Sequence, residues 1–158
     1  MTPQQNKRVS WIAICIAGCA GFLGVAGFEG MRTTPYYDVG GIPTACFGET
    51  EGVEMTDRFT RAQCETMLGN RIERDYGPGV DRCTKVELPP KRKAAMVSFA
   101  YNLGVGRYCR SIAPLLNAGK TLQACTKLLE FVYAGGVKYP GLVTRRKQEY
   151  LLCTEGLT

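Results

Sequence analysis

The sequence predicts an α+β domain, mainly helical, with a small β-hairpin lobe, a cleft between the two parts and an apolar helix at the N-terminus. Three features support this: a turn-rich stretch from Met31 to Thr50, a series of helix-like segments after it, and an uncharged run from Trp11 to Phe28. A small β element beside a helical lobe leaves a natural cleft. No linker or repeat interrupts residues 29–158, so we expect an N-terminal segment, 1–28, and one domain, 29–158.

The apolar run 11–28 has the length and flanks of a membrane segment. Lys7 and Arg8 precede its 18 residues, and Glu29 follows them. A helix needs about 20 residues to cross a bilayer, and this charge distribution places the N-terminus in the cytoplasm and the body outside. A cleaved signal peptide is the alternative, because the run contains small residues of the kind found at cleavage sites.

Glycine recurs at every third position in part of this run, at Gly18, Gly21, Gly24 and Gly27. Each glycine adds no apolar side chain and lowers helix propensity. Membrane insertion is therefore expected to be marginal. Small residues on one face also suit close helix packing within a membrane.

The first elements of the domain follow from turn residues, caps and periodicity. A hairpin is expected around Asp38-Val39-Gly40-Gly41. A helix capped by Thr60 should run to about Tyr76, where Gly77-Pro78-Gly79 would stop it. Pro89-Pro90 should open the next helix, whose apolar residues keep helical spacing up to Gly104.

Three further helices are expected towards the C-terminus. Ser111 can cap a short helix that ends at Gly119. Thr121 can start another, which would carry Leu122, Cys125, Leu129 and Val132 and end at Gly135-Gly136. A last helix should follow Pro140-Gly141.

Composition narrows the chemistry. The chain has no His, which excludes Ser-His and Cys-His nucleophiles and the commonest zinc ligand. We therefore expect carboxylates to transfer protons, with no metal and no cofactor. The net charge of +6 suits an anionic partner, but the short basic cluster of residues 91–93 lacks an aromatic platform, so nucleic acid is not expected.

Six of the eight cysteines lie in the body, and no Cys-x-x-Cys pair occurs among them. Disulfides in an oxidising compartment are the favoured interpretation, although six cysteines permit 15 pairings. We expect Cys64 to pair with Cys83, and Cys125 with Cys153, since each bond would tie neighbouring helical segments together. Whether Cys15 or Cys19 regulates activity is left open.

Three short motifs near the start of the domain resemble the active-site signature of phage lysozymes, glycoside hydrolase family 24. They are Gly27-Phe28-Glu29-Gly30, Tyr37-Asp38 and Gly41-Ile42-Pro43-Thr44. The family's Glu, Asp and Thr are spaced by nine and six positions, as they are here. Residues 94–104 and 140–149 extend the resemblance over nearly the whole body. The chain departs from the family at Glu49, where His often stands.

The resemblance implies a muramidase that hydrolyses the β-1,4 bond between N-acetylmuramic acid and N-acetylglucosamine in peptidoglycan. Glu29 would be the general acid, and its pKa would rise through partial desolvation. Asp38 would stay ionised and orient water together with Thr44. The family outcome is inversion, which requires carboxyl groups about 6.5–9.5 Å apart. Taken singly, each residue also has an ordinary non-catalytic interpretation. Asp38 could be a turn former, Thr44 a strand residue and Glu29 a membrane-boundary residue.

Three supporting residues also follow from the resemblance. Tyr101 and Asn102 would line the cleft wall and contact sugar, with core packing and a helix end as their alternatives. Arg145 would lie near Glu29 and hold it in place. A solvated helix face is the alternative for the basic run 145–147.

As a phage endolysin of the signal-anchor-release type, the protein would first be held in the host inner membrane through residues 11–28 and be inactive there. Release would give an active, soluble periplasmic enzyme, expected to be a monomer. A lytic transglycosylase would not need Asp38 and Thr44, and is the first alternative. A non-catalytic, membrane-anchored peptidoglycan-binding protein is the second.

Overall fold

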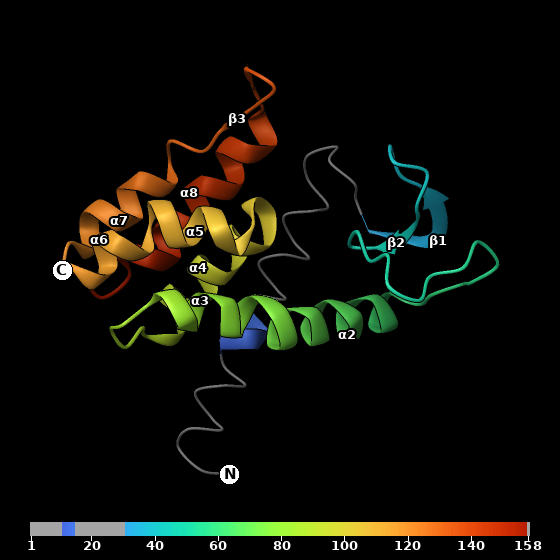
Figure 1. Cartoon of the computed structure of the whole chain (residues 1–158), viewed down its shortest axis with the longest axis horizontal. Coiled ribbons are helices and arrows are strands. Elements are labelled where there is room, and N and C mark those ends of the chain that lie inside the picture. Colours follow the sequence, from blue (N-terminus) through green and yellow to red (C-terminus); the bar gives the residue numbers. More distant parts are fainter. Residues whose placement is uncertain (1–10, 15–30, 158) are drawn as a thin grey trace, which may run out of the picture.

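The computed structural model describes residues 11–14 and 31–157 (Figure 1). A hairpin of two strands lies at one end of the molecule, and long α2 leads from it to a lobe of packed helices. The elements are β1 (Arg32–Tyr37), β2 (Pro43–Cys46), α2 (Arg61–Arg71), η1 (Ile72–Tyr76), α3 (Gly77–Cys83), α4 (Pro90–Leu103), α5 (Val105–Ser111), α6 (Ala113–Asn117), α7 (Thr121–Leu128), β3 (Tyr133–Ala134), β4 (Val137–Lys138) and α8 (Pro140–Thr154). The predicted mainly helical α+β class is confirmed.

Strands β1 and β2 form the expected antiparallel hairpin, with Tyr36 opposite Thr44. The loop between them is closed by Asp38, whose Oδ1 accepts hydrogen bonds from the backbone N–H groups of Gly40 and Ile42 at 2.8 and 2.9 Å. Gly41 has φ +74°, a conformation that glycine adopts without steric cost. Turn chemistry therefore placed this hairpin correctly.

Helix α2 begins as predicted, with a capping box at Thr60. The Thr60 side chain accepts from the Gln63 N–H, and the Gln63 side chain accepts from the Thr60 N–H. The expected stop at residues 77–79 is wrong, because helical backbone continues through the π-helical turn η1 into α3. Pro78 stands in the first turn of α3, where its missing N–H costs little.

The two glycines around Pro78 serve close packing instead of ending the helix. A Cβ built on Gly77 would lie 2.8 Å from the Trp11 indole, and one on Gly79 would lie 2.6 Å from Val105 Cγ2. Both distances are shorter than a carbon–carbon contact permits. Glycine at these positions therefore lets Trp11 and α5 approach the helix.

Helix α4 is the central helix of the lobe, and its residues 94–100 are all buried. It starts at Pro90 as expected and packs against α8. Gly104, with φ +88°, separates it from α5, a helix that the periodicity did not predict. The expectation that Ser111 caps a helix is wrong: Ser111 ends α5, and α6 starts at Ala113 with Pro114 in its first turn.

Helix α7 starts at Thr121 as expected but ends at Leu128. The prediction that it extends to Gly135-Gly136 is wrong, since these glycines form the turn of the β3–β4 hairpin with φ +55° and +80°. Positive φ at both central residues is what a tight two-residue hairpin turn requires. The last helix, α8, begins at Pro140 as predicted.

Three disulfides connect the body: Cys46–Cys64, Cys83–Cys109 and Cys125–Cys153. The expected Cys125–Cys153 bond, which joins α7 to α8, is confirmed. The expected Cys64–Cys83 bond is wrong. Both residues lie on the nearly continuous helical run from α2 to α3, where 19 residues at about 1.5 Å each separate them by roughly 28 Å, far beyond disulfide reach.

Residues 11–14 are helical, and Trp11 lies in the hydrophobic core. The rest of the apolar run, residues 15–28, lies outside the described residues. Within residues 11–14 and 31–157, no helix has both the length and the apolar character to cross a bilayer.

Candidate active site

The predicted general acid, Glu29, lies outside the described residues, which resume at Met31 directly before β1. The predicted cleft between the lobes therefore stays a prediction. Five other predicted site residues are described: Asp38 and Thr44 on the hairpin, Tyr101 and Asn102 at the end of α4, and Arg145 on α8.

Asp38 is half-buried at the hairpin loop. Its Oδ1 accepts hydrogen bonds from the backbone N–H groups of Gly40 and Ile42. Its own backbone N–H donates to the Ile42 carbonyl at 3.0 Å. The carboxylate is therefore held in one orientation by the turn that it closes. The turn-forming role and a catalytic role use the same geometry, so one does not exclude the other.

Thr44 is buried, with 2% of its surface exposed. Its hydroxyl donates to the Ile42 carbonyl at 2.9 Å. Asp38 and Thr44 are thus both oriented by the backbone of Ile42, one through the N–H and the carbonyl, the other through the carbonyl alone. A carboxylate and a hydroxyl fixed on one hairpin can together orient a water molecule.

Tyr101 connects the helical lobe to the hairpin lobe. Its hydroxyl donates to the carbonyl of Phe47, just after β2. Its ring meets that of Tyr76 edge to face, with centroids 5.1 Å apart. The polar end of the side chain is therefore engaged within the protein, and the predicted sugar contact stays a prediction.

Asn102 is exposed, and its Oδ1 accepts a hydrogen bond from Arg146 Nη2 at 3.0 Å. The Arg146 guanidinium is fully buried. The amide of Asn102 is therefore oriented by a hydrogen bond from the interior of the protein. The orientation agrees with a surface role for Asn102, but no described contact tests the predicted sugar binding.

A buried charged cluster, which we define as Ser98, Arg145, Arg146 and Glu149, lies between α4 and α8. Glu149 Oε1 accepts from the Ser98 hydroxyl at 2.7 Å, from Arg146 Nη2 at 3.0 Å and from Arg145 Nε at 3.3 Å. The solvated-face alternative for residues 145–147 is therefore wrong for both arginines and holds only for Lys147, which is exposed.

The sequence analysis missed Arg146 and Glu149 as partners. Burial lowers the pKa of Arg146 to about 10, an effect that the Glu149 carboxylate opposes. Burial likewise raises the pKa of Glu149, against the opposing effect of the two guanidinium groups. The spacings from Arg145 and Arg146 to Glu149, four and three residues, put these side chains on one helix face and were the available signal.

Arg145 is turned towards α4. Its Nη2 donates to the Ser98 carbonyl at 3.1 Å and to the Ser98 hydroxyl at 3.2 Å. A guanidinium has five N–H donors in a planar fork, so these contacts hold it in a fixed plane. Any carboxylate placed beside it would meet an oriented cation.

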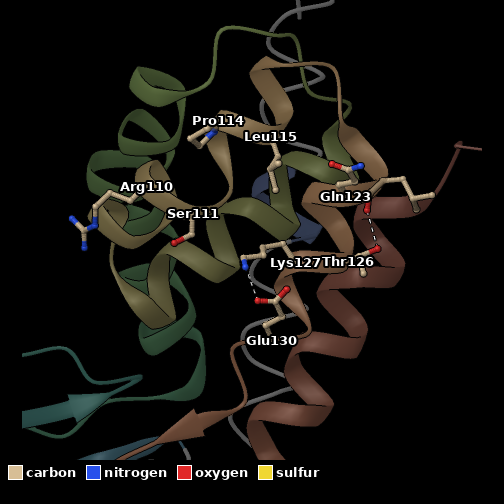
Figure 2. A pocket seen from close by; sticks show the side chains of 9 residues that line it. Arg110, Ser111, Pro114, Leu115, Gln123, Thr126, Lys127 and Glu130 are labelled. Atoms are coloured by element: carbon tan, nitrogen blue, oxygen red, sulfur yellow. Dashed lines mark hydrogen bonds and ion pairs between the residues drawn. The ribbon is translucent and has the colours of Figure 1, made fainter.

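A separate groove of about 640 Å³ lies on the helical lobe, between α5, α6 and α7 (Figure 2). Leu115 and Leu122 supply apolar walls, and Lys127 pairs with Glu130 at its rim at 2.6 Å. None of the five described site residues lines it, so the groove lies apart from them. Among the described residues, no three His, Cys, Asp or Glu side chains gather as a metal site.

Comparison with known proteins places this geometry in context. The family model described as phage lysozyme matches residues 26–149, which include all six predicted site residues. The SAR-endolysin of Enterobacteria phage P21 is 33% identical over 167 residues, covering 99% of both chains. The SAR-endolysin of Bacteriophage PS119 is 35% identical, covering 92% of this chain and 87% of the relative.

Solved structures agree with the sequence matches. The endolysin of Escherichia coli O157:H7 phage FAHEc1 has a TM-score of 0.74 at 25% identity, covering 89% of this chain and 90% of that one. The active form of the P1 phage endolysin Lyz scores 0.71 at 27% identity, covering 93% and 95%. The secreted inactive form of the same endolysin scores 0.51 at 26% identity, covering 68% and 77%.

Proposed function

We propose a function on the premise that this chain belongs to the phage lysozyme family. The protein is a glycoside hydrolase, a muramidase that cuts the glycan strands of peptidoglycan, and it is an endolysin. The match of the family model across residues 26–149 is the observation that carries this conclusion. The fold agrees with it, since the structures of two phage endolysins match this chain with TM-scores of 0.74 and 0.71.

Catalysis is assigned to Glu29, Asp38 and Thr44. Glu29 protonates the glycosidic oxygen, because that oxygen is a poor leaving group until an acid protonates it. Asp38 stabilises the positive charge that develops on the sugar and, with Thr44, directs water to the anomeric carbon with inversion. The common attachment of Asp38 and Thr44 to Ile42 supports this pairing.

Arg145 is assigned the role of holding Glu29. Its guanidinium is buried and oriented by Ser98 and Glu149, which supports a fixed cation at this place. Such a cation opposes the rise in the pKa of Glu29 that desolvation produces. Tyr101 and Asn102 remain assigned to the wall that faces the glycan.

Release of reducing sugar ends from purified peptidoglycan tests the function. The wild-type protein should produce them, and Glu29→Gln should not, because general acid catalysis alone contributes about 10² to 10⁴ in rate. Anhydro ends in place of reducing ends would identify a lytic transglycosylase. Binding without cleavage by either protein would identify a non-catalytic wall-binding protein.

For localisation we propose that residues 11–28 first hold the protein in the host inner membrane, with the body in the periplasm, and then leave the membrane. The relatives named SAR-endolysins support periplasmic release. The greater similarity to the active than to the secreted inactive form of the P1 endolysin supports the described structure as the released, active state. We propose that the released enzyme is a monomer.

A further inference from the structure

Thr44 is followed almost at once by a tight turn, residues 46–49, which we call the β2 turn. Ala45 and Glu49 close it with a reciprocal pair of backbone hydrogen bonds of 2.9 and 2.8 Å. Any movement of Glu49 is therefore passed to Ala45, the neighbour of Thr44 in β2.

The β2 turn has two residues with positive φ, of which Cys46 is in a conformation unfavourable for a residue with a side chain. Cys46 has φ +57° and Gly48 has φ +83°. For a residue with a side chain, such as Cys46, the left-handed conformation is unfavourable and persists only where the surroundings impose it. The turn therefore depends on external attachments to keep its shape.

Among the described residues, a disulfide, a hydrogen bond and an ion pair attach the turn to the helical part of the molecule. The Cys46–Cys64 disulfide ties it to α2, and the Tyr101 hydroxyl ties the Phe47 carbonyl to α4. The third is an ion pair in which Arg71 Nη1, from the last turn of α2, lies 3.1 Å from Glu49 Oε1. Of these attachments, the ion pair is the one that holds Glu49, the residue that closes the turn with Ala45.

Glu49 is held more firmly than a surface carboxylate. Only 11% of its side chain is exposed, and the same Oε1 accepts the backbone N–H groups of Thr50 and Glu51, each at 3.0 Å. Arg71 is held in turn, since its Nε lies 3.1 Å from Asp75 Oδ2. Exposed ion pairs contribute little to stability, but both members of this pair have further partners that fix their positions, so the pair can hold the β2 turn against α2.

We propose that Glu49 is a positioning residue for the hydrolysis. Through Arg71 it fixes the β2 turn on α2, and through Ala45 it keeps Thr44 in register with Asp38. This inference rests on the proposed function, because it presumes that Thr44 and Asp38 act together on water. Glu49 itself touches no reacting atom.

Glu49→Gln provides the first test, because glutamine keeps an oxygen acceptor for the Thr50 and Glu51 N–H groups and removes only the charge. Hydrolysis of soluble peptidoglycan fragments is measured at a temperature at least 15 °C below each variant's unfolding midpoint. We expect kcat to fall on the order of tenfold, less than the ~10²-fold that a 1 Å misplacement can cost. KM should stay within a factor of two, since no substrate contact is lost.

A double-mutant cycle separates positioning from general destabilisation. Arg71→Met should lower kcat, and adding Glu49→Gln to it should lower kcat no further, because interacting partners are not additive. Glu65→Gln, which breaks an exposed ion pair with Arg61 on the same helix, is the matched control and should leave kcat unchanged. Hydrogen exchange at the Ala45 amide should accelerate in Glu49→Gln and stay at the wild-type rate in Glu65→Gln.

Wild-type kcat in Glu49→Gln overturns the inference even if the unfolding temperature falls, because the ion pair would then serve stability alone. Additive losses in the cycle also overturn it. Absence of hydrolysis by the wild-type protein is a different result, since it contradicts the proposed function itself.

Discussion

The hydroxyl of Tyr101, on the central helix α4, donates a hydrogen bond to the backbone carbonyl of Phe47, so that one side chain joins the two lobes. Phe47 is buried, with 6% of its surface exposed. Removing a partner from a buried carbonyl costs about 1–3 kcal/mol.

Tyr101→Phe should therefore lower the free energy of unfolding by about 1–3 kcal/mol. Urea denaturation measures the change, and Tyr133→Phe, at an exposed tyrosine of β3, is the control. Unchanged stability together with a raised KM would show that the hydroxyl serves the sugar and not the lobe contact.

Asp38→Asn should separate catalysis from folding. Asparagine keeps a side-chain oxygen for the Gly40 and Ile42 N–H groups, so the hairpin should form, whereas the charge that stabilises the transition state is lost. Hydrolysis should fall by about 10² or more, with an unchanged thermal midpoint. Asp38→Ala should lose both activity and stability, because it also removes the acceptor. Substantial activity in Asp38→Asn would remove the carboxylate from the mechanism.

The Cys125–Cys153 disulfide closes a loop of 28 residues between α7 and α8. Replacing both cysteines by alanine should lower the free energy of unfolding by about 3–4 kcal/mol, since the bond restricts the unfolded chain. Thermal denaturation measures the loss. Peptide mapping of the oxidised protein checks the connectivity, and any Cys64–Cys83 peptide would contradict the three described pairs.

The burial of Tyr108 predicts that the folded protein loses stability at alkaline pH. Its side chain is fully buried, and burial raises its pKa from 10.0 to about 12. The neutral form is favoured by folding, so its stabilisation is complete below about pH 10 and is lost as the pH rises towards 12, at up to about 1.4 kcal/mol per pH unit.

Tyr108→Phe should remove this part of the pH dependence, at the cost of the hydrogen bond between the hydroxyls of Thr84 and Tyr108. Urea denaturation between pH 9 and 11 checks the slope. The same slope in wild type and Tyr108→Phe would assign the alkaline loss to other groups.

Because the N-terminal run is only weakly apolar, we predict that the strength of its insertion into the membrane controls release of the enzyme. Replacing Gly18, Gly21 and Gly24 by leucine should favour insertion by several tenths of a kcal/mol or more per site, and so keep the protein in the membrane. Lysis after dissipation of the membrane potential, with assay of membrane and soluble fractions, measures this. Release and lysis at wild-type levels by the triple variant would leave the run as an export signal only.

Local signals in the sequence were sufficient where structure depends on neighbouring residues. The Asp38 loop, the cap at Thr60 and the starts of α4 and α8 at prolines were all predicted correctly. Each is decided by the hydrogen bonds or backbone restriction of a few consecutive residues.

Signals that depend on distant packing were misjudged. Gly77 and Gly79 resemble a helix stop in sequence, yet they are contact points for Trp11 and Val105. The partner of Cys64 could not be inferred without knowing that α2, η1 and α3 form one nearly continuous run. Helix α7 ends at Leu128, so Gly135-Gly136 form a hairpin turn and do not end that helix as predicted.

The candidate site shows the same division. The spacing of Asp38 and Thr44 predicted two residues on one hairpin, but not that Ile42 orients both. Arg145 was predicted to hold Glu29, with a solvated face as the alternative for residues 145–147, but the sequence did not reveal that Ser98 and Asn102 of α4 contact Arg145 and Arg146. Glu49 was noted only as a departure from the family, since its partner Arg71 lies 22 residues away.

Because Trp11 is buried in the described structure, its intrinsic fluorescence can report where the N-terminal segment lies. The indole is packed against Gly77, with the Lys93 ammonium 4.7 Å from the ring centroid, and it is the single tryptophan of the chain. At the end of a membrane span the same ring would lie at the boundary between lipid and water. The intrinsic emission of unlabelled protein therefore differs between the two environments, and a quencher dissolved in lipid would reach the indole in only one of them.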